Sequence, residues 1–114
     1  MTTLYGISNC DTVKKARKWL EQQGVDYTFH DFRKDGIERQ QVIDWVNALG
    51  WETLVNKRST TWKGLDDATK NSLNDTSIID IILDQPTLIK RPLLNNSGDL
   101  SVGFKAADYE QRFA

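Results

Sequence analysis

The chain has 114 residues, a formal net charge of −1, one cysteine and one histidine. A chain of this length is expected to form one domain, residues 1–114, and to bury a sufficient core without a disulfide or a structural metal. A charge this close to neutral gives no global field that would recruit nucleic acid or an anionic membrane. No apolar run approaches the length of a membrane span. One cysteine together with His30 is too small a ligand set for a zinc site, so no metal is expected.

The cysteine content and the start of the chain also bear on cellular location. One cysteine cannot form an internal disulfide, which favours a reducing compartment. Met1-Thr2-Thr3 leads directly into a strand pattern rather than into a secretion signal. We therefore expect a cytoplasmic protein.

The only cysteine, Cys10, lies between a predicted strand and a predicted helix. Residues 3–5 are rich in strand formers, residues 6–9 break the strand, and the apolar spacing predicts a helix over about 11–23. The unpaired N–H groups and positive dipole end at the start of a helix favour a thiolate, and Lys14 adds positive potential. Cys10 is therefore predicted to be a reactive nucleophile. The alternative is a small buried apolar residue that happens to be cysteine.

The remaining segments predict the fold class by their order. Residues 26–32 alternate like a half-buried strand, 37–85 carry helical patterns, 87–94 and 100–104 predict a hairpin, and 106–113 predict a last helix. The order β-α-β, helical segment, β-β-α predicts an α/β protein with a four-stranded mixed sheet and flanking helices. Together with a cysteine at the first strand-to-helix turn, this is the thioredoxin arrangement with an all-helical insertion over about 37–85.

Two details of this chain order matter for function. Within the helical segment, residues 55–64 have no clean period and are predicted to form a polar, basic loop. Loops often carry functional residues, and Arg58 is the strongest candidate for one here. Pro92 cannot sit in the middle of a central strand, so it marks a strand start or an edge strand.

Five stretches in this order resemble the arsenate reductase C (ArsC) family, which includes the Spx regulators and the YffB-type proteins. They are Leu4-Tyr5 through Cys10, Lys14-Lys15-Ala16-Arg17, Asn56 through Trp62, Ile89-Lys90-Arg91-Pro92-Leu93, and Val102-Gly103-Phe104-Lys105. The Asn-x-Arg-x-Thr-Thr-Trp loop looks most like the YffB-type branch. The resemblance implies a thioredoxin-like fold with a helical insertion.

The resemblance also implies a set of site residues. Cys10 would be the redox-active nucleophile, Arg91 would help to bind an anion, and Pro92 would be the cis-proline beside the cysteine. The substrate- and anion-binding residues expected on this basis are Arg58, Arg91, Lys105, Lys14, Asn9 and Thr12.

Three departures from the arsenate reductases argue against arsenate as the substrate. Ile7-Ser8-Asn9 stands in place of His-Asn-Pro, Asn56 stands where those enzymes have an arginine, and Lys105 is the only basic residue near another such position. A lysine is a point charge and does not replace a bidentate guanidinium.

No second cysteine is available to resolve an intermediate on Cys10, so the second thiol must come from outside the chain. Glutathione is the expected co-substrate, with no nucleotide cofactor. The resulting prediction is a glutathione-dependent thiol oxidoreductase, an enzyme that acts on a small thiol or oxyanion substrate, with glutaredoxin as a candidate partner.

Two other functions stay open. The chain could be an Spx-like regulatory binding protein that contacts RNA polymerase with little catalysis, through the basic helix face 14–18, or a family member without a redox role. The alternative for the same basic face is an ordinary solvated surface that binds no partner. We expect a monomer.

Overall fold

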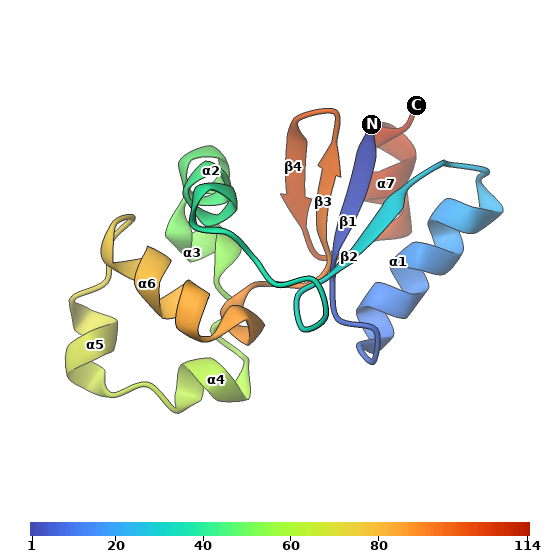
Figure 1. Ribbon diagram of the computed structural model, residues 1–114. Helices are drawn as coiled ribbons and strands as arrows, with labels where there is room; N and C mark the ends of the chain where they lie inside the picture. The colour runs from blue at the N-terminus through green and yellow to red at the C-terminus, as the bar shows by residue number, and fades with distance from the viewer. The chain divides into compact units, whose positions relative to one another are not determined.

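The computed structural model describes residues 1–114 (Figure 1). The chain forms two compact units, one built from Met1–Gly36 with Arg91–Ala114 and the other from Ile37–Lys90. No helix is both long and apolar enough to cross a membrane. The elements in chain order are β1 (Thr2–Gly6), α1 (Asp11–Gln22), β2 (Thr28–Asp31), α2 (Arg39–Leu49), α3 (Trp51–Leu54), α4 (Thr60–Lys63), α5 (Asp67–Asn71), α6 (Ser77–Asp84), the 3₁₀ helix η1 (Pro86–Leu88), β3 (Leu93–Asn96), β4 (Asp99–Val102) and α7 (Ala106–Arg112).

The first unit contains a mixed sheet with strand order β2-β1-β3-β4. β1 runs parallel to β2 and antiparallel to β3, which in turn pairs with β4 in a hairpin. The parallel pair is possible because α1 carries the chain back from the end of β1 to the start of β2. This topology confirms the predicted thioredoxin-like fold class.

Both helices of this unit pack on the same face of the sheet. Leu4 and Leu94, which are paired in register, form one buried cluster with Ala16 and Leu20 of α1 and Tyr109 of α7. The Tyr109 ring meets the rings of Trp19 and Phe104 edge-on, and its buried hydroxyl has no hydrogen-bond partner. Burial raises the pKa of this hydroxyl. Side chains alternate along a strand, so Leu4 faces the helices and Tyr5 faces the opposite side.

α1 approaches the end of β1 closely at Gly6. A Cβ atom built on Gly6 would lie 2.7 Å from Cγ2 of Val13, whose side chain is fully buried. Val13 is β-branched and stiff, so it cannot move aside as a long flexible side chain could. Glycine at this position therefore sets how close the first turn of α1 lies to the sheet.

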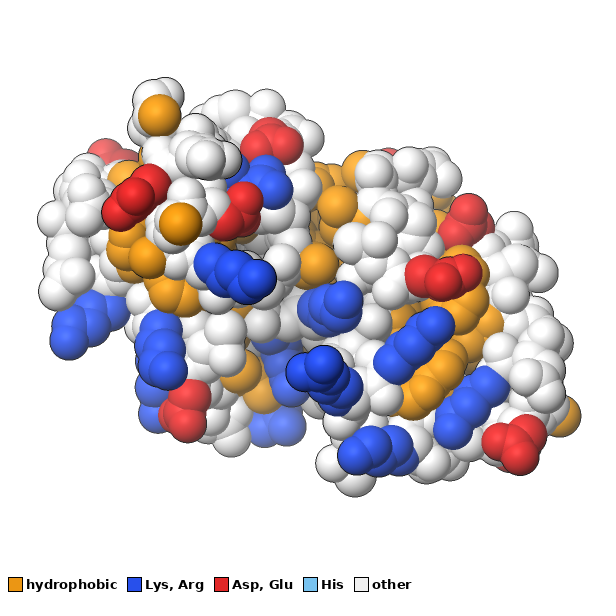
Figure 2. All heavy atoms as spheres, turned by 180° about the vertical axis from the view of Figure 1, so that it is seen from behind, with side chains coloured by type: hydrophobic (Ala, Val, Ile, Leu, Met, Phe, Trp, Pro, Cys, Tyr) orange, Lys and Arg blue, Asp and Glu red, His pale blue; other side chains and the backbone are white.

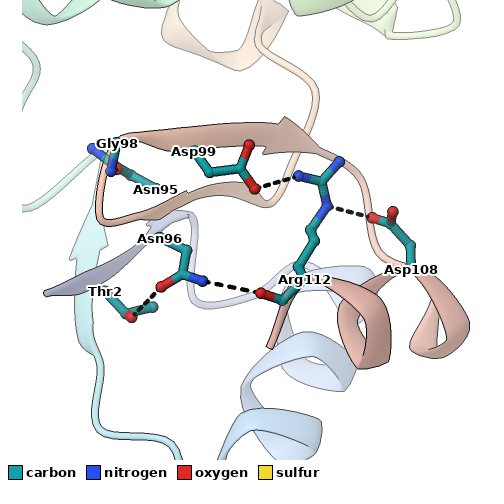
Figure 3. Close-up of polar contacts among 7 residues, drawn as sticks. All are labelled: Thr2, Asn95, Asn96, Gly98, Asp99, Asp108 and Arg112. Atoms are coloured by element: carbon teal, nitrogen blue, oxygen red, sulfur yellow. Dashed lines mark hydrogen bonds and ion pairs between the residues drawn. The ribbon is translucent and has the colours of Figure 1, made fainter. Parts of the chain in front are cut away.

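A polar network ties α7 to the sheet (Figure 3). Arg112 donates from Nε to Asp108 at 2.9 Å and from Nη1 to Asp99 of β4 at 2.8 Å. Asn96 accepts from the Thr2 hydroxyl at 3.0 Å and donates to the Arg112 carbonyl at 3.4 Å. The network joins the first strand, the hairpin and the last helix.

The second unit is built from short helices around an apolar centre. Val55 and Ile89 form an isolated antiparallel bridge beside these helices. The Asn56 N–H donates to the Leu88 carbonyl at 2.7 Å beside it. The fully buried or nearly buried side chains of this unit are Val42, Trp45, Val46, Leu54, Val55, Ile78, Ile82, Leu88 and Ile89.

The boundaries differ from expectation in three places. The insertion was expected over 37–85, whereas the second unit continues to Lys90. The expected loop 55–64 contains α4, because the Ser59 hydroxyl caps it by accepting from the Trp62 N–H at 3.1 Å. The expected strand 87–94 begins only at Leu93, because the preceding residues form η1 and the Val55–Ile89 bridge.

The hairpin turn is also shorter than its composition predicts. Asn96 pairs with Asp99, so only Ser97 and Gly98 form the loop. Both have positive φ, 53° and 96°, as a two-residue hairpin turn requires. The Asn95 side chain accepts from the Gly98 N–H at 2.8 Å, which explains why a turn-forming residue lies inside the strand (Figure 3).

The Gly6–Val13 contact generates a testable prediction. Gly6→Ala should lower the free energy of unfolding by about 1–3 kcal/mol, the usual cost of overpacking a tight core. Gly64→Ala is the matched control, since its Cβ would meet neighbours only at 3.5 Å, and it should change stability little. Urea denaturation measures both.

A double-mutant cycle separates the clash from a general loss of glycine. If the clash is the cause, Gly6→Ala should cost less in a Val13→Ala background than alone. Strict additivity of the two changes would show that the close approach has no energetic consequence.

Candidate functional site

Four segments meet at one end of the sheet in the first unit, the lower end in Figure 1. The register pairs Gly6 with Asp31 and Tyr5 with Leu93, so the end of β2 and the residue before β3 flank the end of β1. Leu93 also pairs with Val102, which brings the chain after β4 to the same edge. The turn that carries Cys10 leaves from this edge.

Cys10 is the N-cap residue of α1. Its backbone is extended, with φ −96° and ψ 124°, and its carbonyl accepts from the Lys14 N–H at 3.0 Å to open the helix. The Cys10 N–H closes a turn onto the Ile7 carbonyl at 3.3 Å. The thiol is free and partly exposed, and no side chain caps the helix. The first-turn N–H groups of α1 therefore lack a side-chain acceptor, next to the cysteine.

The polar residues around Cys10 are mostly open to solvent. Asn9 and Lys14 are exposed, and Thr12 is partly buried at the second helical position. Lys14 takes part in no ion pair, so its charge is not neutralised by a neighbour. Asp11 is a nearby negative group in the first turn. A carboxylate at this point is stabilised by the helix dipole. Its negative charge disfavours a neighbouring thiolate.

Arg91 and Pro92 approach the same edge from β3. Their peptide bond is cis, as the resemblance implies. Pro92 is buried, and its carbonyl accepts from the Gly103 N–H at 2.9 Å, which joins it to the chain after β4. Arg91 is partly exposed and takes part in no hydrogen bond or ion pair. Its guanidinium and its backbone groups are available to a ligand.

Lys105 is the N-cap residue of α7 and is exposed. It follows Gly103, which the hydrogen bond to Pro92 holds at this edge. Lys105 therefore belongs to the same end of the sheet as Cys10 and Arg91, within one unit. Its role in binding stays a prediction.

Arg58 belongs to the second unit. It is exposed, and its N–H donates to the Asn56 side-chain oxygen at 3.0 Å just before Ser59 caps α4. Its guanidinium forms no ion pair. Its participation in the site around Cys10 stays a prediction.

Asp31, at the end of β2, is a buried carboxylate that the sequence did not single out. Its side chain is 5% exposed and accepts from the N–H groups of Arg33 at 2.8 Å and Lys34 at 3.3 Å. Burial would raise the pKa of Asp31, but these N–H groups, that of Ser8 and the charge of Lys34 together hold the pKa below its usual value. Asp31 therefore stays ionised beside the turn that leads to Cys10.

A local signal for Asp31 was present in the sequence. An aspartate at a strand end, followed by residues whose N–H groups can fold back on it, is typical of an Asx turn. The influence of the Ser8 N–H on the pKa of Asp31 had no such signal, because it depends on the parallel pairing of β1 with β2.

The arrangement can support thiol chemistry. It combines a partly exposed cysteine at a helix N-terminus with unpaired cations on neighbouring segments, features that favour a thiolate and an anionic ligand. No group of three or more His, Cys, Asp or Glu side chains is placed to hold a metal ion.

Comparisons with known proteins agree with this geometry. A model of the ArsC family matches residues 5–112. An uncharacterized protein of Haemophilus influenzae is 46% identical over 114 residues, all of both chains. The global transcriptional regulator Spx of Streptococcus pyogenes serotype M1 is 29% identical over 107 residues, which are 91% of this chain and 78% of the regulator. A solved structure of a YffB protein has 43% identity and a TM-score of 0.94 and covers 100% of both chains.

The environment of Asp31 predicts a pH-dependent stability. The folded-state pKa lies below the unfolded value of about 3.9, so the stabilisation is fully present above that value and is lost as the pH falls through the folded pKa. Asp31→Asn should lower the free energy of unfolding at pH 7 by about 1–3 kcal/mol. The difference from wild type should shrink below about pH 4.

Urea denaturation at a series of pH values measures this difference. Asp26→Asn, which changes an exposed carboxylate, is the control and should behave like wild type. A gap between wild type and Asp31→Asn that stays constant down to the acid limit would mean that the ionised carboxylate does not contribute.

Proposed function

Because this chain belongs to the ArsC family, we propose that it is a glutathione-dependent thiol oxidoreductase in which Cys10 is the nucleophile. The observation that carries the proposal is the position of Cys10 at the N-cap of α1, partly exposed, at the sheet edge where Arg91 has no partner. The thiolate form of a cysteine is the reactive species in thiol–disulfide exchange.

The proposed reaction proceeds through one mixed disulfide. The Cys10 thiolate attacks one sulfur of a disulfide, forming a new S–S bond while the old one breaks and the leaving thiolate takes a proton from solvent. A glutathione thiolate then attacks the sulfur that Cys10 has bound, forms a disulfide with that group and releases Cys10 as thiolate. Because the chain has one cysteine, the second thiol must come from outside the chain, and glutathione is the proposed donor.

Charge and backbone groups at the sheet edge support glutathione recognition. Glutathione carries two carboxylates and an extended peptide backbone. The Arg91 guanidinium can bind one carboxylate with two parallel hydrogen bonds, which Lys105 and Lys14 cannot do. The unpaired backbone groups of Arg91 can pair with the peptide part. Asn9 and Thr12, one on each side of the Cys10–Asp11 pair, can supply further polar contacts.

A regulatory binding function is the second candidate. The similarity to a transcriptional regulator supports it, and so do Lys14, Lys15 and Lys18, which stand exposed along α1. Exposed Lys and Arg side chains are prominent on the face shown in Figure 2. In this function the chain would contact an acidic surface of a partner such as RNA polymerase. Binding would then survive Cys10→Ser, which the oxidoreductase function would not.

The oxidoreductase proposal predicts site-specific glutathionylation. Incubation with glutathione disulfide should add one glutathionyl group, at Cys10, faster than to an unstructured cysteine peptide. Arg91→Ala should slow the addition about tenfold or more, the size of one lost charge-assisted hydrogen bond. Lys105→Ala should have a smaller effect. Intact mass against time is the measurement.

Two variants complete this experiment. Cys10→Ser should gain no mass, and Lys18→Ala, which removes an exposed charge from the same helix, should react like wild type. If Arg91→Ala reacts as fast as wild type, the proposed anion site is wrong. If wild type gains no glutathione, the binding function becomes the leading candidate.

We also expect little or no arsenate reduction. Asn56 offers no cation and Lys105 only a point charge, so the oxyanion site is one or two guanidinium groups short. Each missing group should cost about ten- to a hundredfold in affinity or rate. Arsenite formation with glutathione and glutaredoxin is the assay. Ready turnover at millimolar arsenate would show that Arg58 and Lys105 compensate.

A further inference from the structure

Two tryptophans of the second unit stack on each other at its surface, and the proposed reaction uses neither. Trp51 is the first residue of α3 and Trp62 belongs to α4, and their ring centroids lie 6.2 Å apart with the planes at 23°. Both side chains are only partly buried, whereas Trp45 of the same unit is 3% exposed. Tryptophans that keep part of their surface open are typical of sites that bind a partner.

Two lysine side chains lie over this aromatic pair. The Lys57 Nζ is 5.2 Å from the ring centroid of Trp51 and 5.7 Å from that of Trp62. The Lys70 Nζ is 5.6 Å from the ring centroid of Trp62. These distances allow cation–π contacts, which restrict two otherwise flexible side chains. An anion that binds both ammonium groups therefore meets side chains that have already lost part of their freedom.

The backbone beneath the two rings is fixed by side-chain hydrogen bonds. The Trp51 N–H donates to the Asp75 carboxylate at 3.2 Å, and the Trp62 N–H donates to the Ser59 hydroxyl at 3.1 Å. The Ser59 hydroxyl in turn donates to the Asn56 carbonyl at 2.8 Å. Each ring is therefore anchored to the fold independently of the other, and a surface anchored in this way loses little entropy on binding.

Unpaired cations surround the two rings. Residues 56–64 contain Lys57, Arg58 and Lys63 and no Asp or Glu. Arg58, Lys63 and Lys70 take part in no ion pair. Figure 2 shows hydrophobic side chains lying open among Lys and Arg side chains on the second unit. The surface thus combines accessible apolar area with positive charge that no neighbour neutralises.

The acidic side chains near this surface have partners of their own. A Glu52 carboxylate oxygen lies 4.0 Å from the Lys57 Nζ, and both side chains are at least half exposed. An exposed ion pair at this distance contributes little, so another carboxylate can replace it. Asp66 caps α5 by accepting from the Thr69 N–H at 2.7 Å, and Asp75 holds a backbone N–H in the same way. The ammonium groups therefore stay available.

The state of the ring faces favours one kind of partner. A single-stranded nucleic acid binds by stacking its bases on free aromatic faces. Here Trp51 and Trp62 stack on each other, and ammonium groups lie over both rings. What the surface presents is ammonium donors beside the edges of the rings. Carboxylates accept charge-assisted hydrogen bonds from such donors, so the chemistry fits an acidic peptide.

We propose that the surface formed by Trp51, Lys57, Trp62 and Lys70 is a docking site for an acidic peptide segment of a partner protein. The site lies within the second unit and needs no chemistry at Cys10. It is therefore separate from the proposed thiol exchange, and the failure of either proposal leaves the other standing.

NMR of the indole N–H groups of the four tryptophans tests the site. A short polyglutamate peptide should shift the resonances of Trp51 and Trp62 until they saturate and leave those of Trp19 and Trp45 unchanged. Added salt should weaken the binding, because the attraction is between exposed charges. An uncharged glycine–serine peptide of the same length should cause no shift. If Trp51 and Trp62 do not respond to polyglutamate, the proposal is wrong.

Matched double variants locate the charges that bind. Lys57→Gln/Lys70→Gln should weaken polyglutamate binding about tenfold or more, the size of one lost charge-assisted hydrogen bond. Lys15→Gln/Lys18→Gln removes the same charge from exposed positions of α1 and should bind like wild type. Equal weakening in the two variants would mean that only net charge matters, and this result would overturn the proposal.

Two further outcomes would assign the surface to another partner. Tighter binding of a short oligothymidine than of polyglutamate, with shifts at the same two tryptophans, would indicate a nucleic-acid site. Shifts that grow with protein concentration in the absence of peptide would indicate an interface between two copies of this chain. Either result overturns the proposal of an acidic peptide. The wild-type titration decides between these outcomes even where a variant does not fold.

Discussion

The close approach of α1 to the end of β1 is the contact on which the site depends. Gly6 has no side chain, and Val13 occupies the space where a Cβ atom would be. The chain can therefore turn from strand to helix within four residues, and Cys10 becomes the first residue of the helical hydrogen-bond pattern. A larger residue at position 6 would push the helix start away from the sheet edge, and with it the thiol.

The chemistry available at this edge of the sheet depends on the residues at the ends of the strands on either side of β1. The parallel partner β2 ends in Asp31, whose ionised carboxylate holds backbone N–H groups. The antiparallel partner β3 begins after Arg91 and the buried Pro92, which is bound to the chain after β4. A hydrogen-bonded carboxylate therefore lies at the end of one neighbouring strand, while Arg91, which has no ion-pair partner, precedes the other. This asymmetry suits a nucleophile whose ligand is negatively charged.

Sequence reasoning predicted the parts of this fold that depend on local pattern. The apolar spacing of Val13, Ala16 and Leu20 gave α1, and Pro92 correctly marked the start of a strand. Misplaced boundaries came from partners distant in the chain. Asn95 and Asn96 look like turn residues, yet they pair with Thr3 and Thr2 of β1 and lie in a strand. The position of Asp31 beside the end of β1 escaped prediction for the same reason, since only the β1–β2 register pairs it with Gly6. Arg58 was predicted from its polar loop and from the family resemblance, and its role at Cys10 stays a prediction.

The proposed function requires the folded chain to make Cys10 more reactive than an ordinary cysteine. The most direct test compares the rate at which Cys10 reacts with glutathione disulfide in the native protein and in the same protein unfolded in urea. A small free thiol measured in both solutions corrects for the effect of the denaturant. The helix N-terminus and the unpaired cations predict a clearly faster reaction in the native state, despite the partial burial of the thiol. An equal or slower native rate would contradict the account, because the fold would then contribute nothing to the chemistry of its only cysteine.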